Sequence, residues 1–128
     1  MSQIHQEVTF AASPSRVYRA LMESAQHASF TNAPAEISGE AGGAFSAYGG
    51  RVGGRNVELV QDALIVQAWR AANWPKGVYS ITRYELRADG DGTTMIFEQD
   101  GVPEDQVPHI DAGWQRMYWE PMARHLGA

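Results

Sequence analysis

Four histidines are the residues of this chain best suited to acid–base or metal chemistry, because imidazole titrates near neutral pH and binds zinc. They are His5, His27, His109 and His125. No two of them have the spacing of a metal-binding pair, no His-Glu-x-x-His motif occurs, and the chain has no cysteine. A Gly-x-Ser-x-Gly elbow is also missing, so serine hydrolysis has no support. The sequence therefore predicts no catalytic residue, no metal site and no cofactor.

Two of these histidines have neighbours that suggest a structural role. His5 and Glu7 alternate along a predicted strand and share its solvent-facing side, which is ordinary polarity for an exposed strand face. His125 lies near the end of the last predicted helix, where the helix dipole favours a cation. We expect His5 to face solvent on its strand, and His125 to cap the helix or interact with its dipole.

The glycine-rich stretch from Gly49 to Gly54 has some likeness to a phosphate-binding loop. It lacks the Lys-Ser/Thr ending of such a loop, and no strand-to-helix step surrounds it. We interpret it as a hairpin turn.

The large aromatic residues are the positive signal for function. All four tryptophans fall in the second half of the chain, and tryptophan and tyrosine have polar tips that suit a cavity wall. Each ring alone is explained by core packing, but the group exceeds what one small core needs. We predict that these rings and one methionine wall an apolar ligand pocket. The predicted ligand-binding residues are Tyr48, Trp69, Trp74, Tyr79, Phe97, Trp114, Met117 and Tyr118.

Alternating segments separated by glycine predict an antiparallel sheet that positions these rings. Residues 4–10 alternate as a half-buried strand with Gln6 as the exception, and Ser13-Pro14 opens a short helix over about 14–23. Asp89-Gly90 supplies a tight turn between the last two strands. Six further strands are predicted in the segments 35–39, 43–48, 56–60, 64–70, 78–86 and 93–100.

Residues 108–126 return to a helical period with one apolar face. Pro121 should bend this helix, and Trp119 falls about 140° from Trp114, at the sheet rim or on a partner surface. His109 and Arg116 fall on the polar side. The order of strand, helix, six strands and long helix predicts an α+β fold. The apolar face is predicted to contain Val107, Ile110, Trp114, Met117, Tyr118, Pro121 and His125.

The length and charge of the chain bound its class. With 128 residues we expect a single domain over 1–128, and the net charge of −5 disfavours nucleic acid and anionic membranes as partners. The first residues lack the order of a signal peptide, and no apolar run is long enough for a bilayer. We expect a cytoplasmic monomer or homodimer that binds neither nucleic acid nor membranes.

A spaced set of glycine, proline and aromatic residues runs through most of the chain. It comprises Pro14, Gly42-Gly43 with Phe45, Gly54, Trp69-Arg70, Trp74-Pro75 with Gly77, Gly101-Val102-Pro103, and Gly113-Trp114 with Tyr118. In this combination the chain resembles the activator of Hsp90 ATPase homologue (AHSA1-like) family of the START-like, Bet v 1-like (SRPBCC) superfamily. The resemblance implies a helix-grip fold. In that fold a curved seven-stranded antiparallel sheet wraps a long C-terminal helix, with one or two short helices after the first strand and an apolar cavity in between.

Three functional hypotheses follow from the aromatic set and the resemblance. The first is a non-enzymatic protein that binds a small apolar or aromatic molecule without a cofactor. The second is a module that interacts with an Hsp90-type chaperone and activates its ATPase. The eukaryotic co-chaperone that names the family carries a separate Hsp90-binding domain, for which we expect no room here, so the resemblance implies the fold more directly than this activity. The third is a polyketide cyclase-like enzyme, since some START-like relatives use a few polar groups in an apolar cavity.

Overall fold

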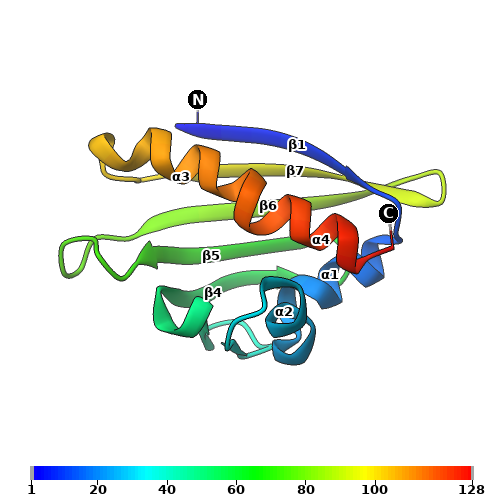
Figure 1. The fold of residues 1–128 in the computed structure, drawn as a ribbon, viewed down its shortest axis with the longest axis horizontal. Coiled ribbons are helices and arrows are strands. Elements are labelled where there is room, and N and C mark those ends of the chain that lie inside the picture. The colour runs from blue at the N-terminus through cyan, green and yellow to red at the C-terminus, as the bar shows by residue number, and fades with distance from the viewer. Residues whose placement is uncertain (1, 128) are drawn as a thin grey trace.

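A long C-terminal helix lies across one face of an antiparallel sheet in this computed structural model, which describes residues 2–127 (Figure 1). The strands are β1 (Ile4–Phe10), β2 (Glu36–Ile37), β3 (Ala44–Ala47), β4 (Val52–Val60), β5 (Leu64–Ala71), β6 (Ser80–Asp89) and β7 (Gly92–Asp100). The helices are α1 (Pro14–Met22), α2 (Ser24–Thr31), α3 (Val107–Trp114) and α4 (Glu120–His125), with short 3₁₀ turns at Tyr48–Gly50 and Glu104–Gln106. The predicted α+β helix-grip fold with a curved seven-stranded sheet is confirmed.

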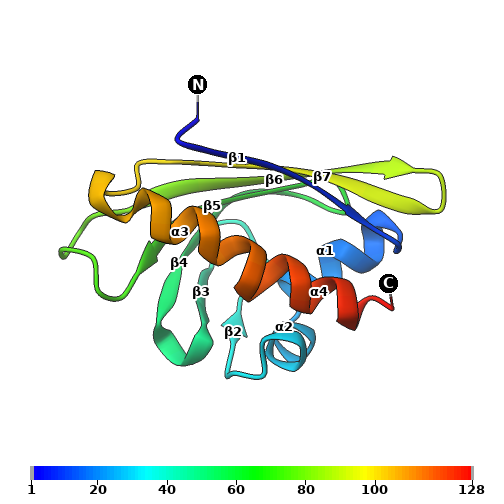
Figure 2. The same cartoon turned by 45° about the horizontal axis from the view of Figure 1, so that its top comes forward.

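The sheet has the order β1-β7-β6-β5-β4-β3-β2, and every neighbouring pair is antiparallel. The meander from β2 to β7 follows chain order, while β1 joins its far edge by pairing with β7. Burial alternates along β7, where every second residue from Thr93 to Gln99 faces the core. Figure 2 shows the sheet curving around the C-terminal helix, with β1 and β2 on opposite sides of it.

Two short helices occupy one end of the sheet. The Ser13 side chain accepts the backbone N–H of Arg16, and Pro14 stands at the first helical position, as the sequence predicts. The sequence pattern did not resolve α2, which has no single apolar face but packs against α4. It ends where Asn32 adopts a left-handed conformation, with φ at 54°.

The C-terminal helix runs without a break from α3 to α4 through a π-helical turn at Gln115–Trp119. The Glu120 N–H bonds to the Gln115 carbonyl, five residues back. Because Pro121 has no N–H, the helix offers no regular donor to the carbonyl of Met117, and the Tyr48 hydroxyl donates to that oxygen instead. A residue of the β3–β4 turn therefore satisfies the helix where its proline leaves an acceptor open.

The π turn changes the directions of Trp119 and Met117 from those that a regular α-helix predicts, although Trp119 does lie at the rim of the sheet, beside Gln6 of edge strand β1. Trp119 is buried, with 1% of its surface exposed, whereas Met117 is 37% exposed. A regular α-helix would point Trp119 away from Trp114, but the wider π turn brings residues five apart onto one side. Trp119 therefore faces the sheet, and Met117 does not.

The glycine-rich stretch contains a turn followed by part of a strand. Gly49 and Gly50 have φ of 64° and 94° in the 3₁₀ turn, which agrees with the predicted turn. The following glycines lie inside β4, which begins at Val52 and not near residue 56. A Cβ atom on Gly54 would stand 1.7 Å from the carbonyl oxygen of Ala68 in β5. Gly54 thus permits a close approach of two central strands.

We predict that Gly54→Ala lowers the free energy of unfolding by more than about 2 kcal/mol, because backbone must move to admit the methyl group. Denaturant unfolding measures this loss. Gly39→Ala is the matched control, since a Cβ there meets nothing within 4 Å. Equal stability of the two variants would contradict the close approach.

Candidate functional site

The indole of Trp114 is fixed to the sheet by a buried chain of hydrogen bonds. Its Nε1 donates to Oε1 of Gln99 at 2.7 Å, and Nε2 of Gln99 donates to Oγ of Ser80 at 3.0 Å. The Ser80 hydroxyl then donates to the backbone carbonyl of Trp69 at 2.8 Å. The chain satisfies each polar group in turn, so the largest side chain of the helix is buried without an unpaired donor.

A second indole is held in the same way at the edge of the sheet. Nε1 of Trp119 donates to Oε1 of Gln6 at 2.6 Å, and Nε2 of Gln6 donates to the backbone carbonyl of Asp111 at 2.9 Å. Gln6 is the residue that breaks the alternation of the first strand. Its core-facing amide anchors the helix to β1, which explains the exception.

Around these anchors the aromatic rings form one continuous cluster. The Trp114 ring lies 4.5 Å from Phe97 and 4.9 Å from Tyr118, measured between centroids. It stacks on Trp119 at 5.3 Å with an interplanar angle of 16°, and Trp69 lies 5.4 Å away on β5. The cluster fills the space under the helix on the β1–β7 side.

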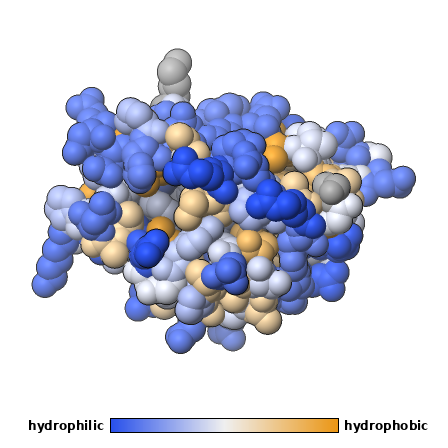
Figure 3. All heavy atoms as spheres, viewed as in Figure 1, coloured by the Kyte–Doolittle hydropathy of each residue, from blue (hydrophilic) through white to orange (hydrophobic). Residues whose placement is uncertain are grey.

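On the other side of the helix the space is not filled, and a pocket of about 410 Å³ opens between the helix and the turn that follows β3. Buried Trp69 and Trp114 rings contribute to its wall. The face of the molecule that carries the helix shows hydrophobic side chains among strongly hydrophilic ones (Figure 3). The lining residues are Tyr48, Arg51, Val52, Trp69, Ala71, Ala72, Asn73, His109, Ile110, Gly113, Trp114, Arg116, Met117 and Tyr118.

The predicted ligand-binding residues divide between this pocket and other places. Those that line the pocket are Tyr48, Trp69, Trp114, Met117 and Tyr118. Phe97 lies in the closed core with no exposed surface, and Trp74 is buried against Trp69 with ring centroids 5.6 Å apart. Tyr79 is 50% exposed, with the Arg70 guanidinium 5.7 Å from its ring centroid. These last three residues do not line the pocket.

The sequence pattern did not predict the arginine, histidine and asparagine residues that line the pocket. His109 and Arg116 were placed on the polar side of the helix, yet both line the pocket. For Arg116 the π turn is the reason, since it changes the direction of the residues that follow Trp114. Arg51 and Asn73 come from turns next to β4 and β5, and no periodic signal marks such positions.

His27 of α2 is a buried histidine that the sequence did not single out. Its Nε2 lies 3.1 Å from the hydroxyl of Tyr118, and its Nδ1 has no hydrogen-bond partner within residues 2–127. Burial lowers the pKa of His27 to about 4, so the ring is neutral at physiological pH. His27 and Tyr118 also border a second cavity of only about 20 Å³, which has room for one water molecule.

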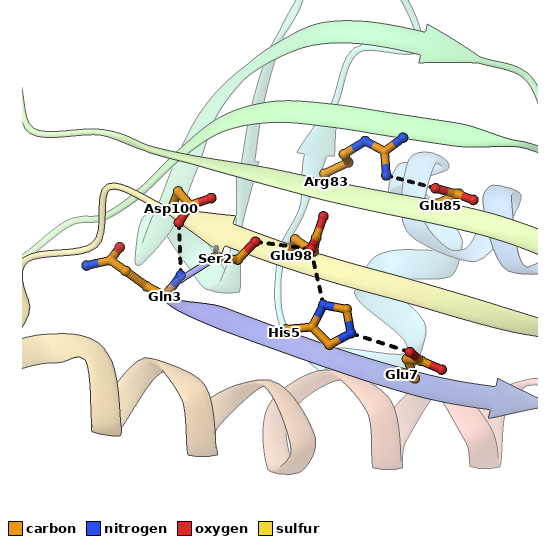
Figure 4. A network of polar contacts seen from close by, with 8 residues as sticks. All are labelled: Ser2, Gln3, His5, Glu7, Arg83, Glu85, Glu98 and Asp100. Atoms are coloured by element: carbon orange, nitrogen blue, oxygen red, sulfur yellow. Dashed lines mark hydrogen bonds and ion pairs between the residues drawn. The ribbon is translucent and has the colours of Figure 1, made fainter.

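The network at His5 lies on the opposite, solvent-facing side of the sheet (Figure 4). Nδ1 of His5 lies 3.1 Å from Glu98 and Nε2 lies 3.4 Å from Glu7. Hydrogen bonds to Glu98 and then to Glu7 raise the pKa of His5, and the bond from His5 lowers that of Glu98. His5 and Glu7 do share a face, as the sequence predicts, in an exposed network.

Two further observations describe the residues that the structure covers. No group of three or more histidine, aspartate or glutamate side chains among residues 2–127 is arranged to hold a metal ion. Within the same range, no helix has both the length and the apolar character needed to cross a bilayer.

Residues 11–127 match the family model described as Activator of Hsp90 ATPase homolog 1-like protein. The chain belongs to this family. It is 33% identical over 120 residues to the human Activator of 90 kDa heat shock protein ATPase homolog 1, an alignment that covers 93% of this chain and 35% of the human one. The chain thus spans about a third of the length of that curated relative.

Two solved structures share the fold of this chain. An HSP90 activator from Plasmodium falciparum superimposes with a TM-score of 0.89 at 19% identity, covering 97% of this chain and 96% of the other. The Aha1 dimer from Colwellia psychrerythraea gives 0.81 at 18% identity, with 96% and 94% covered. At these identities the superpositions establish the fold of the AHSA1-like domain.

We predict that Trp114→Phe costs more unfolding free energy than Trp74→Phe, by about 1 to 3 kcal/mol. Both changes remove an indole of the same size from a buried site, but the first leaves Oε1 of Gln99 unpaired. The second removes an N–H that has no partner within residues 2–127. Denaturant unfolding compares the two, and equal losses would contradict the anchoring role of Gln99.

We also predict that burial of neutral His27 makes stability fall as pH drops. The folded-state pKa of about 4 lies below the unfolded value of 6.5, so the unfolded chain binds the proton more readily between these values. Unfolding free energy should decrease by about 3 kcal/mol from pH 7 to pH 4 through this group. His27→Gln should remove this part of the pH profile.

His5→Gln is the control, because the contribution of His5 to the unfolding free energy changes with pH in the opposite direction. Because the pKa of His5 is raised in the folded state, its stabilisation is present below the unfolded pKa and is lost as pH rises through the folded pKa. The His5 variant should therefore lose stability only at low pH. A His27 variant with the same pH profile as the parent chain would contradict the prediction.

Proposed function

We propose that this domain binds a small apolar or aromatic molecule in the pocket between the C-terminal helix and the sheet. The observation that carries the proposal is the pocket itself, a space of about 410 Å³ bordered by indole rings and aliphatic side chains. Ligand pockets commonly have volumes of about 300–1,000 Å³, apolar walls and few polar groups. Trp69, Ile110 and Trp114 give such walls here, and Asn73 and Tyr48 supply hydrogen-bonding groups.

The position of the pocket also supports binding. The buried hydrogen-bond chain fixes the direction of the Trp114 ring, and the Trp69 ring packs against it with centroids 5.4 Å apart, so a ligand meets rings that are already ordered. The neighbouring π turn presents Met117, an adaptable side chain that fits ligands of different shape.

We predict that an apolar ligand of this pocket changes tryptophan emission and raises the melting temperature. Two indoles border the pocket, and a molecule that binds only the native state stabilises it by mass action. At a free concentration of about 100 times Kd the gain is about 2.7 kcal/mol. A screen of fatty acids, flavonoids, sterols and polyketide-like aromatics by thermal shift and fluorescence measures it.

Gly113→Leu should block the pocket without destabilising the fold, so it tests whether the ligand binds at this site. Gly113 lines the pocket, and a Cβ there meets nothing within 4 Å. Leucine in a helix is more favourable than glycine by about 0.5–1 kcal/mol, so the variant should be at least as stable and should bind the screened ligand at least about tenfold more weakly. Ala112→Leu, at the exposed neighbouring position, should bind normally. Unchanged binding by the Gly113 variant would contradict the site.

A second candidate function is activation of an Hsp90-type chaperone ATPase. It is favoured by the human relative, which is named an activator of the 90 kDa heat shock protein ATPase, and by the Plasmodium HSP90 activator. An ATPase assay with the chaperone of the same organism tests it, with and without a pocket ligand. Stimulation of the ATPase by a protein that binds no compound in the screen would favour this candidate over the pocket function.

A cyclase-like reaction would need an acid or base that reaches the bound molecule. His109 is the one histidine among the described residues that line the pocket, and it is exposed, with no side chain within residues 2–127 hydrogen-bonded to its ring to orient it. His27 has an orienting hydroxyl from Tyr118, but it borders the small inner cavity. The pocket therefore favours binding over catalysis.

A further inference from the structure

The charges around the pocket differ from those of the rest of the chain. The sequence has 15 acidic residues and 10 lysines and arginines, yet among residues 2–127 no aspartate or glutamate lines the pocket, whereas Arg51 and Arg116 both do. Asn73 and His109, which also line the pocket, carry no negative charge. The lining of the pocket thus combines apolar side chains with a local positive charge, although the net charge of the chain is negative.

Neither guanidinium is neutralised by the protein. Within residues 2–127 no ion pair and no side-chain hydrogen bond involves Arg51 or Arg116, and both are exposed. The far face of the sheet shows the contrast, because Arg83 there lies 2.8 Å from Glu85 (Figure 4). The arginines of the pocket keep their donors free for a group from outside.

The two arginines come from different elements. Arg51 ends the 3₁₀ turn that leads into β4, and Arg116 belongs to the π turn of the helix. The pocket between these elements is therefore lined by one arginine from its sheet side and another from its helix side. A guanidinium binds a carboxylate through two parallel N–H donors. Its planar arrangement of donors matches the two carboxylate oxygens better than an ammonium group does.

We propose that the ligand of this pocket is an amphiphilic anion, with an apolar alkyl or aromatic body against Trp69 and Trp114 and a carboxylate at Arg51 and Arg116. This inference rests on the proposed function and adds the chemical class of the ligand. The apolar walls hold the body of the molecule, and the charged mouth selects acids over neutral molecules of equal size.

The test compares matched acids and alcohols, dodecanoate with dodecanol and 2-naphthoate with 2-naphthol, below the concentration at which micelles form. Isothermal titration calorimetry measures the affinity of each at low salt. In at least one pair the carboxylate should bind about tenfold more tightly than the alcohol, and added salt should weaken the acid alone. Equal affinity of acid and alcohol would overturn the inference and leave the apolar pocket standing. Failure of all four compounds and of the wider screen would overturn both.

Substitution of each arginine tests whether Arg51 and Arg116 cause the preference for a carboxylate over an alcohol. Arg51→Gln and Arg116→Gln should each weaken carboxylate binding about three- to tenfold and should weaken alcohol binding by a smaller factor. Arg124→Gln is the matched control, because Arg124 is an exposed arginine of α4 that does not line the pocket. Equal weakening of acid and alcohol by the Arg116 variant, or the same loss in the Arg124 variant, would contradict a carboxylate at these residues.

Discussion

The hydrogen bond from the Trp114 indole to the Gln99 amide is the contact on which the arrangement of helix and sheet depends. A buried tryptophan contributes a large apolar surface, but its N–H must find an acceptor or the burial loses much of its benefit. Gln99 provides that acceptor from near the end of β7, the strand next to edge strand β1, and its own amide donates to Ser80. With Gln6 holding Trp119 in the same manner, the helix is fixed in register against β7 and β1. One side of the helix is therefore closed by packed rings, and the open space lies on the other side.

The π turn links this anchor to the pocket. It brings Trp119 onto the same side as Trp114, and it places Arg116 and Met117 at the pocket. Pro121 follows directly, and its missing N–H leaves the Met117 carbonyl for the hydroxyl of Tyr48. That bond ties the helix to the turn before β4, on the sheet side of the pocket. Irregular helical turns often occur at functional sites, and here the irregularity decides which side chains reach the cavity.

The sequence was sufficient for most of the fold because alternation, glycine turns and one helical stripe are local signals. It identified the strands from β1 to β7, the first helix and the long C-terminal helix. It failed for Trp119 and Met117, because a constant angle per residue cannot show a π turn. Of the predicted wall, Trp69 and Trp114 lie at the pocket while Phe97 lies in the closed core. An alternating strand shows which side chains face inward, but it does not show where the interior is left unfilled.

The roles of several polar residues could not be predicted from the sequence, because they too depend on how distant elements pack together. Arg51 and Arg116 are ordinary exposed arginines until a turn and a helix bring them to one cavity. Gln6 interrupts the alternation of the first strand because its side chain accepts a hydrogen bond from Trp119, which lies 113 residues later in the chain. His27 sits in a helix without an apolar face, so nothing in its neighbourhood predicts burial.

We propose that a ligand binds on the β4–β5 side of the helix, outside the closed aromatic core. Intermolecular nuclear Overhauser effects between a bound aromatic carboxylate and the protein test it most directly. We expect contacts from the ligand to the rings of Trp69 and Trp114 and to the methyl group of Met117, with none to Phe97 or to exposed Ile81 on the far face. Contacts to Ile81 and Tyr79, with none to Trp69 or Trp114, would contradict it.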